Sequence, residues 1–261
     1  MRVEDCAYPG GFNRKVNSML RFICTGLLLA LMSISTQAEE PIRQLIAKAI
    51  EAHGGRAALK ESLCARVTAD GVMKFMGKHL PFTLVGTYDL PHSSQTTIKL
   101  DFEGKELSLT QSVVNGQVGM KLSGFDLPVD PKLRREILAT IRIQHLTKIV
   151  PLDQEIASLK LIRDVAVKNT PCSAIQVKDP VNGDILLYFA ADSSLLVKIE
   201  RVGMGPDQQE GRQEIYLLDH QRNHKIMIPK TIEIYTDGQL TTRTTNYRYE
   251  YLQSQSHNQS P

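Results

Sequence analysis

Residues 80–90 read LPFTLVGTYDL, and apolar side chains recur at every second position along much of this stretch. One face of this stretch would carry Phe82, Leu84, Gly86 and Tyr88. Successive side chains of a β-strand point to opposite sides, so a two-residue period predicts a strand with one buried face.

Two neighbouring stretches continue this pattern. Residues 96–102 place Ile98, Leu100 and Phe102 on one face, and residues 105–114 do the same with Leu107 and Leu109. The Asn115-Gly116 pair that follows is a strong signal for a two-residue hairpin turn. These short strands and tight turns predict an antiparallel sheet that buries one face.

In three stretches the apolar side chains recur at the spacing of a helix instead of a strand. Residues 42–53 carry apolar side chains at helical spacing and end at Gly54-Gly55, and residues 56–63 form a second short helix. A third helix, residues 131–146, begins at Asp130 and Pro131, a capping residue and a first-turn proline. The predicted apolar side of this helix holds Leu133, Ile137, Leu138, Ile141 and His145. The opposite side, which is expected to face away from the sheet, holds Arg134, Arg135, Glu136 and Arg142.

Seven more strands are expected after this helix. They cover about 158–168, 172–178, 184–190, 194–203, 212–219, 225–236 and 239–251. We therefore predict an α+β fold: a large curved antiparallel sheet forming an open half-barrel, with an N-terminal helix pair and one lid-like helix on the concave face. A single domain would cover residues 39–252, followed by a flexible tail at 253–261.

The N-terminus resembles a secretory signal peptide. Residues 22–34, FICTGLLLALMSI, form an apolar run of about 13 residues after three basic side chains, shorter than the roughly 20 that a spanning helix needs. Small residues precede a predicted cleavage after Ala38. Met19 opens a complete signal by itself, so translation is expected to start there. The alternative is an uncleaved anchor. Residues 1–38 are thus assigned to export, and the protein to the periplasm or the exterior.

Composition excludes several classes of protein. The chain has 261 residues, 31 Lys and Arg against 28 Asp and Glu, and 42% hydrophobic residues. This is ordinary globular composition, and the small net charge of +3 argues against a nucleic-acid binder. We therefore expect that the protein binds no nucleic acid and that it is a monomer.

Two cysteines lie beyond the signal segment, Cys64 and Cys172. An oxidising compartment would allow them to form a disulfide, and the alternative is two separate buried thiols. Neither has the CxxC or CxH spacing of a metal site.

No catalytic motif is present. The sequence holds no GxSxG elbow, P-loop or GxGxxG fingerprint, so we predict a protein that is not an enzyme and needs no cofactor or metal. Asp219, His220 and His224 are the most suggestive polar group, but they fall in a strand–turn–strand context, where a turn with exposed histidines is expected. His53, at a helix end, is expected to cap or pack.

Three stretches carry a resemblance to a known family. They are AIEAHGGRAALKESLCARVTADGVM (49–73), LLYFAADSSLLVKIER (186–201) and EIYLLDHQRNHKIMIPKTIEIYTDG (214–238). They resemble the helix–Gly-Gly–helix–strand start and the later strand–turn–strand units of the LolA/LolB-like superfamily of lipoprotein-sorting and related envelope proteins. The resemblance implies a half-open barrel that carries or senses acyl chains of lipids or lipoproteins.

The alternating strands give candidates for such a site. The predicted lining residues are Phe82, Leu84, Tyr88, Ile98, Leu100, Phe102, Leu107, Leu109, Ile137 and Ile141. The prediction is an exported envelope protein that binds a lipid or an acylated protein in the half-barrel. For any single one of these residues, ordinary core packing is the favoured alternative. The alternative function is a non-catalytic sensor or structural module that contacts an envelope protein partner.

Overall fold

The computed structural model describes residues 39–179, 183–205 and 209–252. Residues from Ile42 onward form one compact unit. The predicted signal peptide (1–38) and tail (253–261) lie outside the described residues.

Within the described residues the strands form one 13-stranded antiparallel sheet in the order β6-β5-β4-β3-β2-β1-β13-β12-β11-β10-β9-β8-β7. The N-terminal arm comprises β1 (Cys64–Phe75), β2 (Lys78–Asp89), β3 (Ser93–Phe102), β4 (Lys105–Val114), β5 (Gln117–Leu122) and β6 (Phe125–Asp126). The C-terminal arm comprises β7 (Leu159–Val167), β8 (Thr170–Val177), β9 (Ile185–Ala190), β10 (Leu196–Met204), β11 (Glu210–Asn223), β12 (Ile226–Thr236) and β13 (Gln239–Tyr251).

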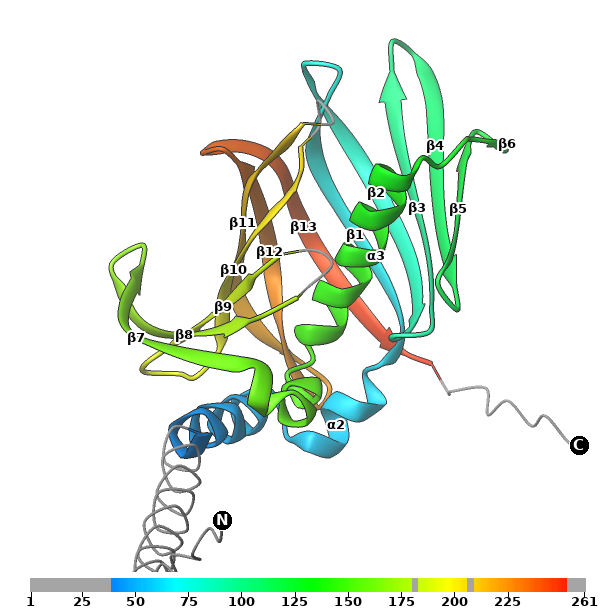
Figure 1. The fold of residues 1–261 in the computed structure, drawn as a ribbon. Helices are drawn as coiled ribbons and strands as arrows, with labels where there is room; N and C mark the ends of the chain where they lie inside the picture. The colour runs from blue at the N-terminus through cyan, green and yellow to red at the C-terminus, as the bar shows by residue number, and fades with distance from the viewer. Residues whose placement is uncertain (1–38, 180–182, 206–208, 253–261) are drawn as a thin grey trace, which may run out of the picture. The chain divides into compact units, whose positions relative to one another are not determined.

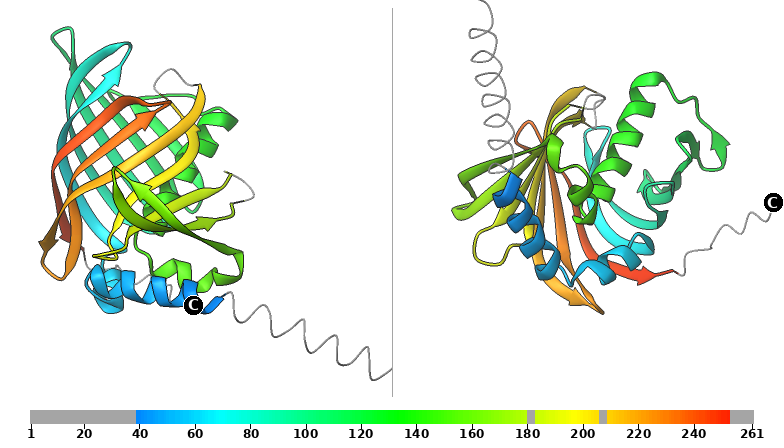
Figure 2. Two further views of the ribbon diagram at one scale, coloured as in Figure 1. Left: turned by 90° about the vertical axis from the view of Figure 1, so that its left-hand side faces the viewer. Right: turned by 60° about the horizontal axis from the view of Figure 1, so that its bottom comes forward.

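Each arm is a meander in which neighbours in sequence are neighbours in the sheet, and the two arms join where β1 pairs with β13. Figure 2 shows the strong curvature of this sheet, which leaves a concave side. The predicted fold class, an open half-barrel of α+β type, is confirmed.

The turn chemistry explains the meander. Asn115 and Gly116 have φ of 48° and 78°, and Asp237 and Gly238 have φ of 49° and 77°. Two successive positive φ values are the type I′ geometry that matches the twist of paired strands. The hairpin predicted at Asn115-Gly116 is therefore confirmed, and Asp237-Gly238 forms a second turn of the same geometry.

The helices lie at one end of the sheet and across its concave side. Residues 39–52 are helical, α2 spans Arg56–Glu61, and α3 spans Pro131–Leu146, followed by two 3₁₀ turns at Val150–Gln154 and Ile156–Ser158. The Asp130 side chain accepts a hydrogen bond from the Leu133 N–H at 2.7 Å, which is the predicted cap. Figure 1 shows α3 running across the concave side between the two arms.

Two hydrophobic clusters hold these layers together. The larger joins the end helices to β1 and the C-terminal arm, with Ile46, Leu146 and Phe189 fully buried. The smaller contains Leu90, Val113, Ile137 and Ile141, and it attaches α3 to the N-terminal arm. Because α3 packs on β4 and β5, it leaves space between itself and the C-terminal arm.

The opposite face of the C-terminal arm carries charged side chains in cross-strand pairs. Lys198 Nζ lies 3.0 Å from Glu200 Oε2 and also pairs with Glu214, although only 7% of Lys198 is exposed. Buried cations of this face are thus matched by carboxylates.

Candidate ligand-binding cavity

A cavity of about 430 Å³ lies between α3 and the concave face of the sheet. Its volume is within the range of small-molecule sites. Its apolar walls come from α2, β1, β2 and β10–β12. They include Leu59, Ala69, Leu84, Leu196, Ile199, Ile215, Leu217, Ile226, Met227, Ile228, Pro229, Ile232 and Ile234.

Helix α3 contributes one stripe to the cavity and another to the core. Glu136, Thr140, Ile143, Gln144 and Thr147 recur at helical spacing and line the cavity. Leu133, Ile137, Leu138 and Ile141 form the adjacent stripe, which packs on the second hydrophobic cluster. The predicted apolar side of α3 therefore does pack on the sheet at these four residues. The prediction that Glu136 faces away from the sheet is wrong, because Glu136 lines the cavity.

Two tyrosines of β13 complete the wall. A residue with positive φ, Asn246 (52°), lies where the pairing with β1 shifts register. The irregularity is followed by Tyr247 and Tyr249, which both face the cavity. Burial raises the pKa of both phenols, so both stay protonated at neutral pH.

One end of the cavity holds a half-buried lysine, Lys148. Lys148 Nζ donates a hydrogen bond to the Tyr249 hydroxyl at 2.7 Å and lies 4.4 Å from the centre of that ring. The Tyr249 hydroxyl in turn donates to the Ser62 carbonyl. Burial lowers the pKa of Lys148 to about 7, because removal from water penalises the ammonium form.

His53 lies near the same end, and both of its ring nitrogens are engaged. Nδ1 donates to the Ala49 carbonyl at 2.8 Å, and Nε2 accepts from the Leu196 N–H at 3.3 Å. Burial lowers the pKa of His53 to about 4, so this imidazole is neutral. The expectation that His53 caps and packs is confirmed.

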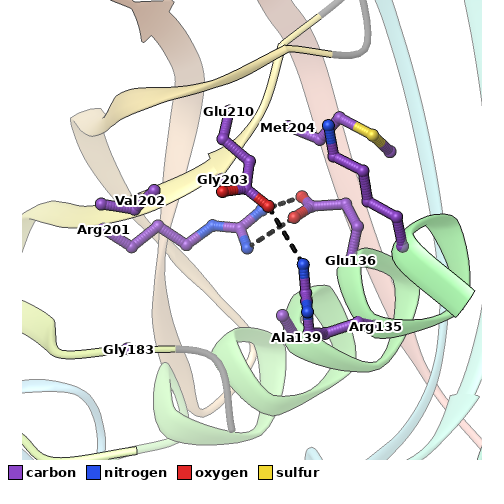
Figure 3. A pocket seen from close by; sticks show the side chains of 10 residues that line it. Arg135, Glu136, Ala139, Gly183, Arg201, Val202, Gly203, Met204 and Glu210 are labelled. Carbon is purple, nitrogen blue, oxygen red and sulfur yellow. Dashed lines mark hydrogen bonds and ion pairs between the residues drawn. The ribbon is translucent and has the colours of Figure 1, made fainter.

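The other end is polar. Glu136 and Arg201 form a bidentate ion pair and line both the cavity and an adjoining pocket of about 330 Å³. Figure 3 shows this pair and, beside it, Arg135 reaching Glu210 at 3.0 Å. The Glu136–Arg201 pair therefore separates an apolar space from a polar one.

Of the predicted lining residues, Leu84 and Tyr88 line this cavity. Phe82 and Leu100 are buried, and Ile137 and Ile141 belong to the second cluster. The half-buried remainder lies on the N-terminal arm: Ile98, Phe102, Leu107 and Leu109. A role for these residues in ligand contact stays a prediction.

Sequence reasoning missed the polar groups of the cavity, namely Lys148, Gln144 and the Glu136–Arg201 pair. One signal for Lys148 was present: it interrupts the otherwise apolar stretch that contains Leu146, Ile149 and Val150. A lysine flanked by buried residues is a candidate for a functional role.

The two cysteines are free thiols, as in the second alternative, but only Cys172 is buried, whereas Cys64 is half-buried. Cys64 starts β1 and Cys172 lies on β8, and β13, β12, β11, β10 and β9 lie between these strands. At about 4.8 Å per strand this distance exceeds the reach of a disulfide, which needs Cα atoms within about 7 Å.

The histidine cluster differs in part from expectation. β11 continues to Asn223 through an irregularity at Asp219 (φ 52°), so His220 is a half-buried strand residue that lines the cavity. His224 occupies the turn and is exposed, as expected. Among the described residues no group of three or more His, Cys, Asp or Glu is placed to hold a metal ion.

None of the helices formed by the described residues is both long and apolar enough to cross a membrane.

Comparison with known proteins reveals a likeness in structure alone. No family model matches the sequence, and no curated protein matches it. The fold matches a LolA superfamily protein from Nitrosomonas europaea with a TM-score of 0.53 and 9% identity, covering 81% of this chain and 93% of the other. A DUF1329 family protein from Desulfovibrio piger matches with a TM-score of 0.49 and 9% identity, covering 81% and 93%. A domain described as outer membrane lipoprotein-sorting, from Vibrio parahaemolyticus, matches with a TM-score of 0.48 and 10% identity, covering 80% and 94%. The first of these likenesses, which extends over most of both chains, shows that the chain has a LolA-like fold.

Proposed function

We propose that this protein is an exported, non-enzymatic binder of an apolar ligand, and that the ligand is an acyl chain of a lipid or an acylated protein. The observation that carries the proposal is the cavity between α3 and the C-terminal arm, whose walls are mostly aliphatic and aromatic. The signal-like N-terminal sequence supports export, and the LolA-like fold agrees with an envelope role.

The energetics favour a chain-like ligand. Each methylene removed from water contributes about 0.8 kcal/mol, so about ten buried methylenes contribute about 8 kcal/mol before the cost of association. Strong binding therefore needs no charged contact along most of the cavity. Thr140 and Thr244 also line the cavity, and because they are polar but uncharged a hydrocarbon chain can lie against them.

The alternative, a module that contacts a protein partner through a free sheet edge, has less support. The edge strand β6 is only two residues long. The other edge, β7, has a register irregularity at Asp164 (φ 55°) and carries the charged residues Lys160 and Arg163. Short strands, bulges and charges are the features that prevent strand addition.

The test is native mass spectrometry of protein purified from an envelope fraction, followed by organic extraction. We expect a bound species that is released as a lipid or an acylated peptide. Uptake of a fluorescent fatty acid by the delipidated protein provides the second measurement. A clean mass together with no uptake would reject the proposal and favour the protein-contacting module.

A further inference from the structure

Lys148 is a half-buried cation that lines the cavity and has no carboxylate partner among the described residues. Its side-chain contacts there are the hydroxyl and ring of Tyr249. The two buried cations among the described residues are matched: Lys198 pairs with Glu200 and Glu214, and Arg201 pairs with Glu136. An unmatched ammonium that is partly removed from water is costly, and proteins commonly keep such groups for function.

The backbone holds Lys148 in the cavity. The α3 helix ends at Leu146, and Ile149 adopts a positive φ of 63° in the turn that follows. Both Leu146 and Ile149 are fully buried. Because these neighbours are anchored in the core, the backbone on either side of Lys148 is held in place beside the cavity.

The groups around Lys148 are donors, neutral rings or already engaged. The charge of Lys148 lowers the pKa of His53 on the preceding helix and of His145 on α3, and His220 lies beside His53, with ring centres 6.3 Å apart. The Glu155 carboxylate, which acts on His145, is paired with Arg142. Burial lowers the pKa of all three histidines. None of them supplies a negative charge.

A second polar group shares this part of the cavity. Gln144 lies one helical turn before Lys148 and lines the cavity, and its Oε1 is buried without a hydrogen-bond partner among the described residues. The Oε1 atom is an acceptor and cannot bind a carboxylate, but the Nε2 amide of the same side chain can donate to one oxygen of an acid group while the ammonium donates to the other. The ammonium has three donors and Tyr249 uses one, which leaves two for a ligand.

We propose that Lys148, assisted by Gln144, binds the carboxylate of the ligand, and that the cargo is a free fatty acid or a similar single-chain acid. The inference rests on the proposed function, because it assumes that the cavity holds an acyl chain. The head group lies at Lys148, and the chain extends along α3 towards Glu136. The ten helical steps from Glu136 to Leu146 span about 15 Å at 1.5 Å each, which gives the chain its path.

This binding takes up a proton. In the free protein the pKa of Lys148 is about 7, so at pH 8 most molecules carry the neutral amine. A carboxylate beside the amine restores the ammonium form. The three neighbouring histidines are neutral at that pH and do not contribute. Fatty-acid binding at pH 8 therefore takes up close to one proton, whereas an ester takes up none.

The test compares laurate with methyl laurate, which differ in charge but share the same chain. Both displace the neutral reporter N-phenylnaphthylamine from the wild-type protein, and we expect laurate to bind more tightly. In Lys148→Met the affinity for laurate should fall about ten- to a hundredfold, the value of a hydrogen bond to a charged group, while methyl laurate is unaffected. Lys168→Met is the matched control, because Lys168 lies 4.3 Å from the Tyr216 ring outside the cavity and is half exposed.

Titration calorimetry of the wild-type protein at pH 8, in buffers of different ionisation enthalpy, measures the proton uptake and does not depend on any variant. Equal binding of the acid and the ester without proton uptake would overturn the role of Lys148 and leave the proposed function standing. Failure of both ligands to bind would instead reject the proposed function.

Discussion

The carboxylate of Glu136 on α3 and the guanidinium of Arg201 on β10 form a bidentate ion pair that joins the crossing helix to the C-terminal arm. The Arg201 side chain is 6% exposed and that of Glu136 is 19% exposed, so both charges are largely removed from water. On its other side α3 is held by apolar packing on β4 and β5. The helix is therefore attached to the two arms by different kinds of interaction.

Glu136→Gln should destabilise the fold strongly. The substitution leaves Arg201 buried and unmatched, and breaking a buried pair costs about 3–5 kcal/mol. The double variant Glu136→Leu with Arg201→Met should recover most of that loss, because no charge stays buried. Urea unfolding of the three proteins measures both quantities.

Arg135→Met serves as the control for this pair. Arg135 pairs with Glu210 on the surface, and both side chains are about half exposed. We expect a change in the free energy of unfolding below about 1 kcal/mol. A similar loss in Arg135→Met and Glu136→Gln would contradict the distinction between buried and exposed pairs.

Lys148→Met should make the ligand-free protein more stable at pH 7. The folded-state pKa of about 7 lies below the ordinary value of 10.5, so between these values the unfolded chain binds more protons. Wild-type stability should therefore rise with pH above 7, by up to a few kcal/mol, and Lys148→Met should lack this rise. Thermal unfolding from pH 7 to 9.5 provides the comparison.

The direction of this change in stability distinguishes a purely structural role of Lys148 from a role in ligand binding. If the hydrogen bond to Tyr249 served only the fold, removal of the lysine would lower the unfolding temperature at every pH. A more stable variant that binds fatty acid poorly is the outcome expected of a binding residue.

Acid should destabilise the protein partly through His53. Its pKa is about 4 in the folded state against 6.5 ordinarily, so the unfolded state takes up its proton first as the pH falls. Stability is lost between pH 6.5 and 4, and the contribution of His53 is about 3 kcal/mol. His53→Gln should flatten the fall between pH 6.5 and 4.5 in urea titrations. An unchanged slope would show that His53 is accessible to water.

Leu84→Trp should fill the cavity and block ligand uptake. Leu84 lines the cavity, whereas Val85, the next residue of β2, is 40% exposed on the other face and gives the matched control Val85→Trp. If the space is open, the larger ring enters it and thermal stability changes little. If Leu84 were close-packed instead, the same substitution would cost about 1–3 kcal/mol. Fluorescent fatty-acid uptake and thermal unfolding distinguish these outcomes.

Local signals in the sequence were sufficient to predict the architecture. Asn115-Gly116 and Asp237-Gly238 fixed two hairpins because few residue pairs adopt two positive φ values in succession. Asp130 and Pro131 located the start of α3 through capping. Such features depend on neighbours in sequence, so no knowledge of the rest of the fold was needed.

The position of the cavity could not be predicted in the same way. Alternation placed Leu84 with Ile98 and Leu109 on one face, but it contains no information about which arm of the sheet α3 packs against. Helix α3 covers the N-terminal arm through Ile137 and Ile141, and the open space lies over the C-terminal arm. Glu136 was placed on the wrong side because its partner, Arg201, is 65 residues away.

The pairing of β1 with β13 has a consequence for how the protein comes to be active. These strands lie at opposite ends of the sheet-forming chain, and β13 supplies Tyr249, which is 101 residues away from its partner Lys148. Each of the other strand pairs joins neighbours in sequence and can form as the chain emerges. The cavity is therefore completed only when the last strand of the sheet pairs with the first, so a chain that lacks β13 would have the meanders of both arms without a closed cavity.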